Sequence, residues 1–219
     1  MITTILLAIV AAYLIGSVPS GFVVIKLLTG EDLTRLGSGR TGGTNALRAG
    51  GVWAGLITGA LDILKGAGAV WLARWMLSGQ IIAVSSLPGV EALAGVAVVI
   101  GHNWSLYLGF RGGAGTGPNV GAAIALWSYA GLILPPFVPL VLFLTGYASV
   151  ASLCTAMLIP FMFAFVARYA GLPWEYFWYG LGTWVVVTWA LRPNIARLLN
   201  GTERRVRFGR IHQQRPMTR

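Results

Sequence analysis

Long apolar segments, separated by shorter polar ones, make up most of this chain. A helix needs about 20 mainly apolar residues to cross a bilayer, and helix ends are expected near prolines. On these criteria the chain divides into seven apolar segments, roughly 5–28, 52–76, 89–108, 118–134, 136–147, 150–168 and 174–190. Pro19 is expected to kink the first segment, and the fifth is short or strongly tilted. The pattern predicts an all-α, polytopic membrane bundle of about seven transmembrane helices, with residues 1–204 as a single domain.

The composition excludes an ordinary soluble domain. Only 10% of the 219 residues are charged and 56% are hydrophobic, whereas soluble domains contain about 25% charged residues. The net charge is +10, and eight of the sixteen basic residues lie from Arg192 onward, directly after the last apolar segment. Because basic residues flank membrane spans on the cytoplasmic side, we expect a cytoplasmic C-terminus and no nucleic-acid partner. An odd number of spans places the N-terminus outside, and residues 205–219 are expected to form a mobile, basic cytoplasmic tail.

Neither a disulfide nor a metal centre is indicated. Cys154 is the single cysteine and lies within an apolar run, so it is expected to be a small core residue. No group of Cys, His and carboxylate residues has the spacing of metal ligands, and we therefore expect no metal and no other cofactor. The sequence leaves the oligomeric state open, and a monomer is compatible with it.

The most unusual polar segment is residues 37–48, which reads GSGRTGGTNALR. Glycines let the backbone turn sharply and bring its N–H groups close to a ligand, and Thr44 and Asn45 are expected to cap a helix that begins just after them. A helix N-terminus behind a glycine-rich turn favours anions, and Arg40 and Arg48 add positive charge suited to phosphate. Two interpretations stay open: a phosphate-binding loop at the membrane surface, or a flexible loop whose arginines face lipid headgroups.

A second loop, residues 109–119, repeats this chemistry with glycines, Arg111, the hydroxyl of Thr116 and then a helix start. Two predicted spans separate the loops, so both are expected on the same side of the membrane. Arg192, Asn194 and Arg197 follow the last span and are expected to close the same site from a third direction. The repetition favours an anion site over a flexible loop.

Among the polar residues inside predicted spans, three are candidates for a functional role. Asp62 and Lys65 lie three residues apart and therefore on one helical face, and His102 lies near the end of the third span. Charges within a membrane are costly, so these residues are expected to be paired or functional. An internal ion pair that fixes helix packing and direct catalysis both stay open, and a lone histidine here is more typical of a packed, hydrogen-bonded residue than of a base.

In this order, the motifs resemble the bacterial acyl-phosphate:glycerol-3-phosphate acyltransferase family. The resemblance covers nearly the whole chain and rests on residues 16–21 (GSVPSG), 37–48, 61–66 (LDILKG), 101–103 (GHN), 110–116 and 194–203. It implies a seven-helix enzyme of the bacterial inner membrane with its active site facing the cytoplasm. Such an enzyme transfers a fatty acyl group from acyl phosphate to the sn-1 hydroxyl of glycerol 3-phosphate, giving lysophosphatidic acid and phosphate.

The resemblance also implies roles for individual residues. It implies catalytic roles for Ser38, Arg48 and Asn194. It implies substrate or phosphate binding by the two loops, namely by Gly39, Arg40, Thr41, Gly42, Thr44, Asn45, Arg111, Gly112, Gly113, Gly115 and Thr116. Asp62, Lys65, His102 and Arg192 are expected to support this site.

Several positions depart from the family pattern. Arg40 replaces an asparagine, Ala114 replaces the second lysine of Lys-Gly-Gly-Lys-Gly, Leu191 replaces a histidine, and the pair at 104–105 is Trp-Ser rather than Phe-Pro. Three hypotheses follow. The chain is an active acyltransferase in which Arg40 stands in for the missing lysine, a non-catalytic paralogue that binds a lipid or phosphate ester, or a small anion transporter.

Overall fold

The computed structural model describes residues 2–78 and 86–206, and within these ranges the chain is helical. Its α-helices are α1 (Ile2–Ser17), α2 (Ser20–Thr29), α3 (Gly43–Leu77), α4 (Leu87–Asn103), α5 (Thr116–Leu126), α6 (Ala130–Thr145), α7 (Ala148–Ala170), α8 (Glu175–Ala190) and α9 (Arg192–Leu199). Two short 3-10 turns, η1 (Leu33–Arg35) and η3 (Leu106–Leu108), lie in the loops. The predicted all-α fold is confirmed.

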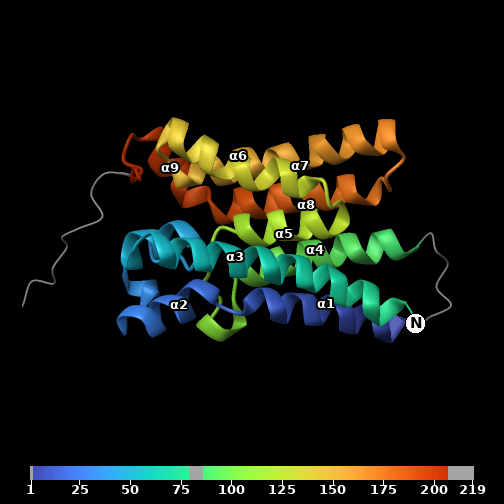
Figure 1. Cartoon of the computed structure of the whole chain (residues 1–219), viewed down its shortest axis with the longest axis horizontal. Coiled ribbons are helices and arrows are strands. Elements are labelled where there is room, and N and C mark those ends of the chain that lie inside the picture. Colours follow the sequence, from blue (N-terminus) through green and yellow to red (C-terminus); the bar gives the residue numbers. More distant parts are fainter. Residues whose placement is uncertain (1, 79–85, 207–219) are drawn as a thin grey trace, which may run out of the picture.

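The helices form two groups that run along the long axis of the molecule (Figure 1). Helices α1 to α4 pack together on one side and α6 to α8 on the other, with α5 between them. Glycines allow the closest contact, between α3 and α5. A Cβ at Gly66 would lie 2.2 Å from Pro118 O, and a Cβ at Gly121 would lie 1.9 Å from Ile63 O. The two backbones therefore touch, as small residues permit in membrane helices.

The predicted kink at Pro19 is a complete break between α1 and α2. The proline has φ −87° and ψ 73°, outside the helical range. The break frees backbone carbonyls, and these find side-chain donors elsewhere in the bundle: Ser105 Oγ donates to Ser17 O at 2.5 Å and Lys65 Nζ to Val18 O at 2.8 Å. Such replacement donors are what make a broken helix tolerable inside a membrane.

The division of residues 118–147 was predicted wrongly. Pro135 and Pro136 were expected to separate two spans, but both lie inside α6. The chain instead breaks at Trp127, whose backbone is extended (φ −150°, ψ 108°). Membrane helices tolerate internal prolines because neighbouring groups satisfy the freed carbonyls. The short helix is therefore α5, with 11 residues, and not the segment at 136–147.

By length and composition, three segments could each span a membrane: Ile2–Thr29, Gly43–Leu77 and Ala148–Ala170. Helices Leu87–Asn103 and Ala130–Thr145 are apolar but shorter. The N-terminus and α9 lie at opposite ends of the bundle (Figure 1), as an odd number of crossings requires. The count of seven spans and the orientation of the termini stay predictions.

The beginning of the basic tail packs against the bundle. Val206 is buried, and its N–H donates to Gly146 O at 2.8 Å. The Arg205 guanidinium lies 5.3 Å from the centre of the Tyr147 ring. Residues 207–219, for which mobility was predicted, lie outside the described residues.

Candidate active site

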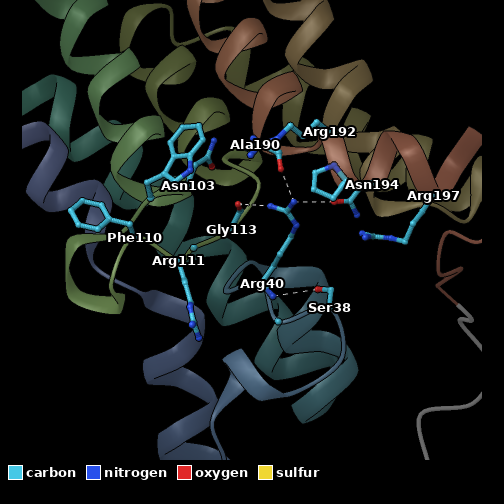
Figure 2. A pocket seen from close by; sticks show the side chains of 14 residues that line it. Ser38, Arg40, Asn103, Phe110, Arg111, Gly113, Ala190, Arg192, Asn194 and Arg197 are labelled. Carbon is cyan, nitrogen blue, oxygen red and sulfur yellow. Dashed lines mark hydrogen bonds between the residues drawn. The ribbon is translucent and has the colours of Figure 1, made fainter.

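A pocket of about 360 Å³ opens at the end of the bundle that holds α9. Three separate segments line it (Figure 2). The first loop contributes Ser38, Gly39 and Arg40. The end of α4 and the second loop contribute Asn103, Trp104, Phe110, Arg111, Gly112 and Gly113. The end of α8 and helix α9 contribute Ala190, Arg192, Pro193, Asn194 and Arg197. The prediction that both glycine loops and the segment after the last span meet on one side is confirmed.

Arg40 crosses the pocket and connects all three segments (Figure 2). Its Nη1 donates to Gly113 O at 2.8 Å, and its Nη2 donates to Ala190 O at 2.7 Å and to Asn194 Oδ1 at 2.9 Å. These acceptors are uncharged. They orient the guanidinium, which has five N–H donors, without neutralising it.

The electrostatics of Arg40 follow from this position. Burial, with a further contribution from the charge of Arg197, lowers the pKa of the Arg40 guanidinium, and Glu203 partly offsets the effect. An arginine nevertheless stays protonated at neutral pH. Within the described residues, no carboxylate lies within ion-pair distance of Arg40. The pocket therefore holds a half-buried positive charge that lacks a counter-ion.

Arg111, Arg192 and Arg197 bring three more guanidinium groups to the pocket, and no acidic side chain is among the described residues that line it. Arg192 lies 4.5 Å from the centre of the Trp189 ring. Arg197 is paired with Glu203, its Nε lying 2.8 Å from Oε2. The pocket is strongly positive, and guanidinium groups match the geometry of phosphate oxygens.

Glu203 fixes the side of the pocket formed by α9. Its Oε1 accepts from Asn194 Nδ2 at 2.8 Å and from Ser149 Oγ at 3.1 Å, and its Oε2 accepts from Arg197. Partial burial raises the pKa of Glu203, but the hydrogen bonds from Asn194 and Arg197 and the charge of Arg197 outweigh it. The net pKa lies below the usual 4.5. The carboxylate is therefore ionised at neutral pH, and it holds Asn194 so that its Oδ1 accepts from Arg40.

The first loop is organised by Asn45, which does not line the pocket. This buried side chain accepts from Ser38 N at 3.0 Å and donates to Leu36 O at 3.0 Å and to Arg40 O at 2.8 Å. Left-handed backbone at Gly37 (φ +53°) and at the next glycine completes the turn. The Asn45 amide thus shapes the loop that presents Ser38 and Arg40.

The prediction that Thr44 and Asn45 cap the following helix is wrong. Helix α3 begins at Gly43 with Gly42 as its N-cap. The N–H of Asn45 already bonds to Gly42 O at 3.0 Å, so Asn45 lies in the first helical turn. With the extended backbone of Gly42 (φ −85°, ψ 167°) before it, the helix starts three residues earlier than the side-chain preference suggested.

The glycines of the second loop are required by packing against the end of α4. A Cβ at Gly113 would lie 1.9 Å from His102 Nε2, and Gly113 N donates to His102 O at 3.0 Å. The second ring nitrogen of His102 also has a partner: Nδ1 lies 2.9 Å from Lys65 Nζ, which in turn lies 2.9 Å from Asp62 Oδ1. The structure therefore supports the packing interpretation for the charged pair and for His102, which stand behind the second loop and outside the pocket.

The structure separates the predicted site residues into two sets. Eight line the pocket: Ser38, Gly39, Arg40, Arg111, Gly112, Gly113, Arg192 and Asn194. Ten do not: Thr41, Gly42, Thr44, Asn45, Arg48, Asp62, Lys65, His102, Gly115 and Thr116.

Two residues of the second set have contacts of their own. Arg48 is exposed and donates to Arg204 O at 3.4 Å, whereas Thr116 Oγ1 lies 2.6 Å from Ser152 Oγ on α7. Both contacts join the glycine loops to later parts of the chain.

Two departures from the family pattern lie behind the pocket wall. Leu191 is 1% exposed and belongs to the main apolar core, and Ala114 packs against the same core. Sequence reasoning did not identify Asn103, Trp104 and Phe110 as site residues. The available signal was their position in the sequence, because Phe110 belongs to the second glycine loop and the other two residues come a few positions before it.

Comparison with known proteins gives one result throughout. A family model described as glycerol-3-phosphate acyltransferase matches residues 6–201. Glycerol-3-phosphate acyltransferase 2 of Moorella thermoacetica is 37% identical over 207 residues, which cover 92% of this chain and 97% of the relative. Glycerol-3-phosphate acyltransferase of Prochlorococcus marinus is 36% identical over 202 residues, with coverage of 92% and 97%.

Solved structures give the same answer. The crystal structure of PlsY, an integral membrane glycerol 3-phosphate acyltransferase, in its glycerol 3-phosphate form has a TM-score of 0.77 and 31% sequence identity, covering 93% of this chain and 96% of that one. Its lysophosphatidic acid form has a TM-score of 0.75 and 30% identity, covering 94% and 97%. This chain belongs to the glycerol-3-phosphate acyltransferase family.

Proposed function

We propose that this chain transfers a fatty acyl group from acyl phosphate to the sn-1 hydroxyl of glycerol 3-phosphate, releasing lysophosphatidic acid and phosphate. The observation that supports this proposal is the pocket at one end of an apolar bundle, which is lined by guanidinium groups and by no acidic residue of the described ranges. Both substrates are phosphate esters or anhydrides, and one of them is also a lipid. A cationic pocket at the end of membrane helices suits both requirements.

The chemistry needs little beyond positioning and charge. Acyl phosphate is an activated mixed anhydride, so the glycerol hydroxyl attacks the carbonyl carbon, the new C–O ester bond forms and the C–O bond to phosphate breaks. The departing phosphate carries the electron pair, and the hydroxyl proton passes to a phosphate oxygen or solvent. Holding the two reactants together and stabilising the developing charge are the main contributions available to the protein.

We assign roles on the basis of the pocket. Arg40 and Arg111 bind phosphate oxygens, Asn194 is oriented by Glu203 and Arg40, and Ser38 donates to substrate from the tip of the first loop. Arg48 lies outside the pocket, and its proposed role rests on the family resemblance. The departures at Ala114 and Leu191 support a second candidate function, that of a non-catalytic paralogue that binds the same esters.

We further propose that the protein is a multi-pass protein of the bacterial inner membrane with this pocket facing the cytoplasm. The basic residues that follow α8 support this orientation. Its water-soluble substrate, glycerol 3-phosphate, would then enter from the cytoplasm and its lipid substrate from the bilayer.

The test is product formation by the purified full-length protein in lipidic mesophase with palmitoyl phosphate and radiolabelled glycerol 3-phosphate. Lysophosphatidic acid above a protein-free control is the expected result. Arg111→Ala should lower turnover. Arg168→Ala, near the C-terminal end of α7 and outside the pocket lining, should not. No product from well-folded protein that is still stabilised against heat by glycerol 3-phosphate would reject the enzyme in favour of the non-catalytic paralogue.

A further inference from the structure

Asn103, the last residue of α4, has a buried side chain that forms no hydrogen bond with the described part of the chain. Its relative exposure is 5%, and neither Nδ2 nor Oδ1 has a partner. The residue lines the pocket (Figure 2), and so does Trp104, the next residue along the chain. A buried amide that forgoes both its donor and its acceptor costs about 1–3 kcal/mol for each group. Such an exception in a native protein calls for an explanation, and at the wall of a pocket a bound ligand provides one.

The surroundings of Asn103 are firmly held, so the missing bonds do not reflect a loosely built region. Tyr13 OH donates to Trp104 O at 2.9 Å, and Gly113 N donates to His102 O at 3.0 Å. The amide itself lies against Gly115, where a Cβ would be 2.8 Å from Asn103 Oδ1. The backbone on both sides of Asn103 is therefore tied to other segments, and only its amide is left without a partner.

The chemistry of the free groups identifies the kind of ligand atom. A phosphate oxygen only accepts hydrogen bonds and would use the amide N–H groups alone. A hydroxyl both donates and accepts, so it matches a free Oδ1 and a free Nδ2 together. The guanidinium groups of the pocket can only donate, whereas the free amide of Asn103 can donate to a hydroxyl and accept from it at the same time.

Glycerol 3-phosphate carries two hydroxyls. The attacking hydroxyl loses its proton and becomes an ester oxygen, so it would leave Oδ1 without a donor during the reaction. The C2 hydroxyl stays a hydroxyl throughout and keeps both hydrogen bonds in the transition state, where binding accelerates the reaction.

We infer that Asn103 binds the C2 hydroxyl of glycerol 3-phosphate and so selects this substrate over phosphate esters that lack that hydroxyl. The inference rests on the proposed acyltransferase function and adds a specificity residue to it. A site built to hydrogen-bond a substrate hydroxyl discriminates strongly against an analogue without it, because its polar groups then stay unpaired.

The experiment compares glycerol 3-phosphate with 3-hydroxypropyl phosphate, which keeps the attacking hydroxyl and the phosphate but lacks the C2 hydroxyl. For the unaltered protein we expect kcat/KM to favour glycerol 3-phosphate by at least about tenfold. For Asn103→Leu, similar in shape but apolar, the two values should lie within about threefold of each other. If the leucine variant does not fold, Asn103→Ala allows the same comparison of kcat/KM for the two esters.

Two controls separate specificity from structure. Thr188→Val removes a different buried polar group, a hydroxyl that has no partner among the described residues and lies outside the pocket lining, and should leave the substrate ratio unchanged. Asn103→Leu should not lower the melting temperature, since replacing an unpaired buried amide by an apolar group of similar shape is nearly neutral or stabilising. Heat stabilisation by each ester reports binding independently of turnover and should show the same preference.

The outcomes are distinct. An unchanged substrate ratio in Asn103→Leu, with turnover of both esters, would overturn the role of Asn103 and leave the acyltransferase proposal standing. A fall in melting temperature together with an unchanged ratio would identify Asn103 as a purely structural residue. Absence of product from either ester would overturn the proposed function, and equal heat stabilisation by the two esters would then also overturn the inference.

Discussion

Arg40 is the residue for which the structure makes the sharpest prediction. Its guanidinium lies between the second loop and α9 and donates hydrogen bonds to Gly113 O, Ala190 O and Asn194 Oδ1. The second loop has an alanine, Ala114, next to the glycine that Arg40 contacts. If Arg40 supplies the phosphate-binding charge that this loop lacks, the charge should be movable from one position to the other.

The perturbation is a pair of exchanges, Arg40→Asn and Ala114→Lys, made singly and together. A hydrogen bond from a charged group contributes about 1.5–3 kcal/mol, which corresponds to roughly 10- to 150-fold in rate. Arg40→Asn should therefore lower kcat/KM for glycerol 3-phosphate by roughly this factor. The double variant should recover most of the loss, because the flexible stem of a lysine can bring its ammonium group to the pocket.

The assay is the palmitoyl phosphate reaction, with the melting temperature of each variant measured alongside. Arg40→Lys is the matched control: it keeps the charge but cannot form the forked contact to three acceptors, so it should fall between the unaltered protein and Arg40→Asn. Full activity in Arg40→Asn would refute the reasoning. So would a double variant no more active than Arg40→Asn, because the loss would then come from broken loop contacts and not from charge.

Three further predictions concern the bundle and α9. Gly66→Ala should lower the melting temperature because its Cβ would overlap the α5 backbone, whereas Gly68→Ala, with open space at that position, should be neutral or raise stability by about 0.4–1 kcal/mol. Removing one member of the buried Asp62–Lys65 pair by Asp62→Asn or Lys65→Met should cost about 3–5 kcal/mol, and removing both should cost less than the sum of the two, measured as unfolding in detergent. Folding lowers the pKa of Glu203, so its contribution to stability is present above pH 4.5 and is lost as the pH falls through the lower folded value. The acid-induced loss of stability should therefore be smaller in Glu203→Gln. Equal acid sensitivity of the two proteins would contradict this.

Much of the fold follows directly from the sequence. The apolar segments predict where most of the helices lie. The chain also breaks at Pro19, where a proline was expected to disturb the helix because it lacks an N–H and has a fixed φ. Hydropathy does not predict the break at Trp127, because the residues around it are as apolar as a helix interior and only their backbone angles differ. It also misjudges Pro135 and Pro136, since the tolerance of a proline depends on which neighbours satisfy the freed carbonyls.

The site was predictable as a set of segments but not as a set of contacts. The two glycine loops and the residues after α8 do meet in one pocket. The sequence does not reveal that Asn45 turns inward to organise the first loop, because an asparagine beside glycines fits a helix cap, a ligand contact and a loop brace equally well. The sequence also does not show why position 113 must be a glycine: Gly113 lines the pocket, and the space that a Cβ would need is taken by His102.

The contrast between paired and unpaired charges carries the functional argument. Inside the bundle, where an isolated charge is costly, Lys65 is paired with Asp62 and Arg74 with Glu91, at 2.9 Å and 2.5 Å. Neither pair lines the pocket.

At the pocket, Arg40, Arg111 and Arg192 have no carboxylate within ion-pair distance in the described part of the chain. Leaving these three charges without counter-ions in one concave space is unfavourable for folding alone, because like charges repel and because the half-buried Arg40 also loses part of its water. An anion that enters the pocket relieves both costs at once. The same imbalance also explains why losing the lysine at position 114 need not abolish the site: the first loop and α9 already place more positive charge around the pocket than their own carboxylates neutralise.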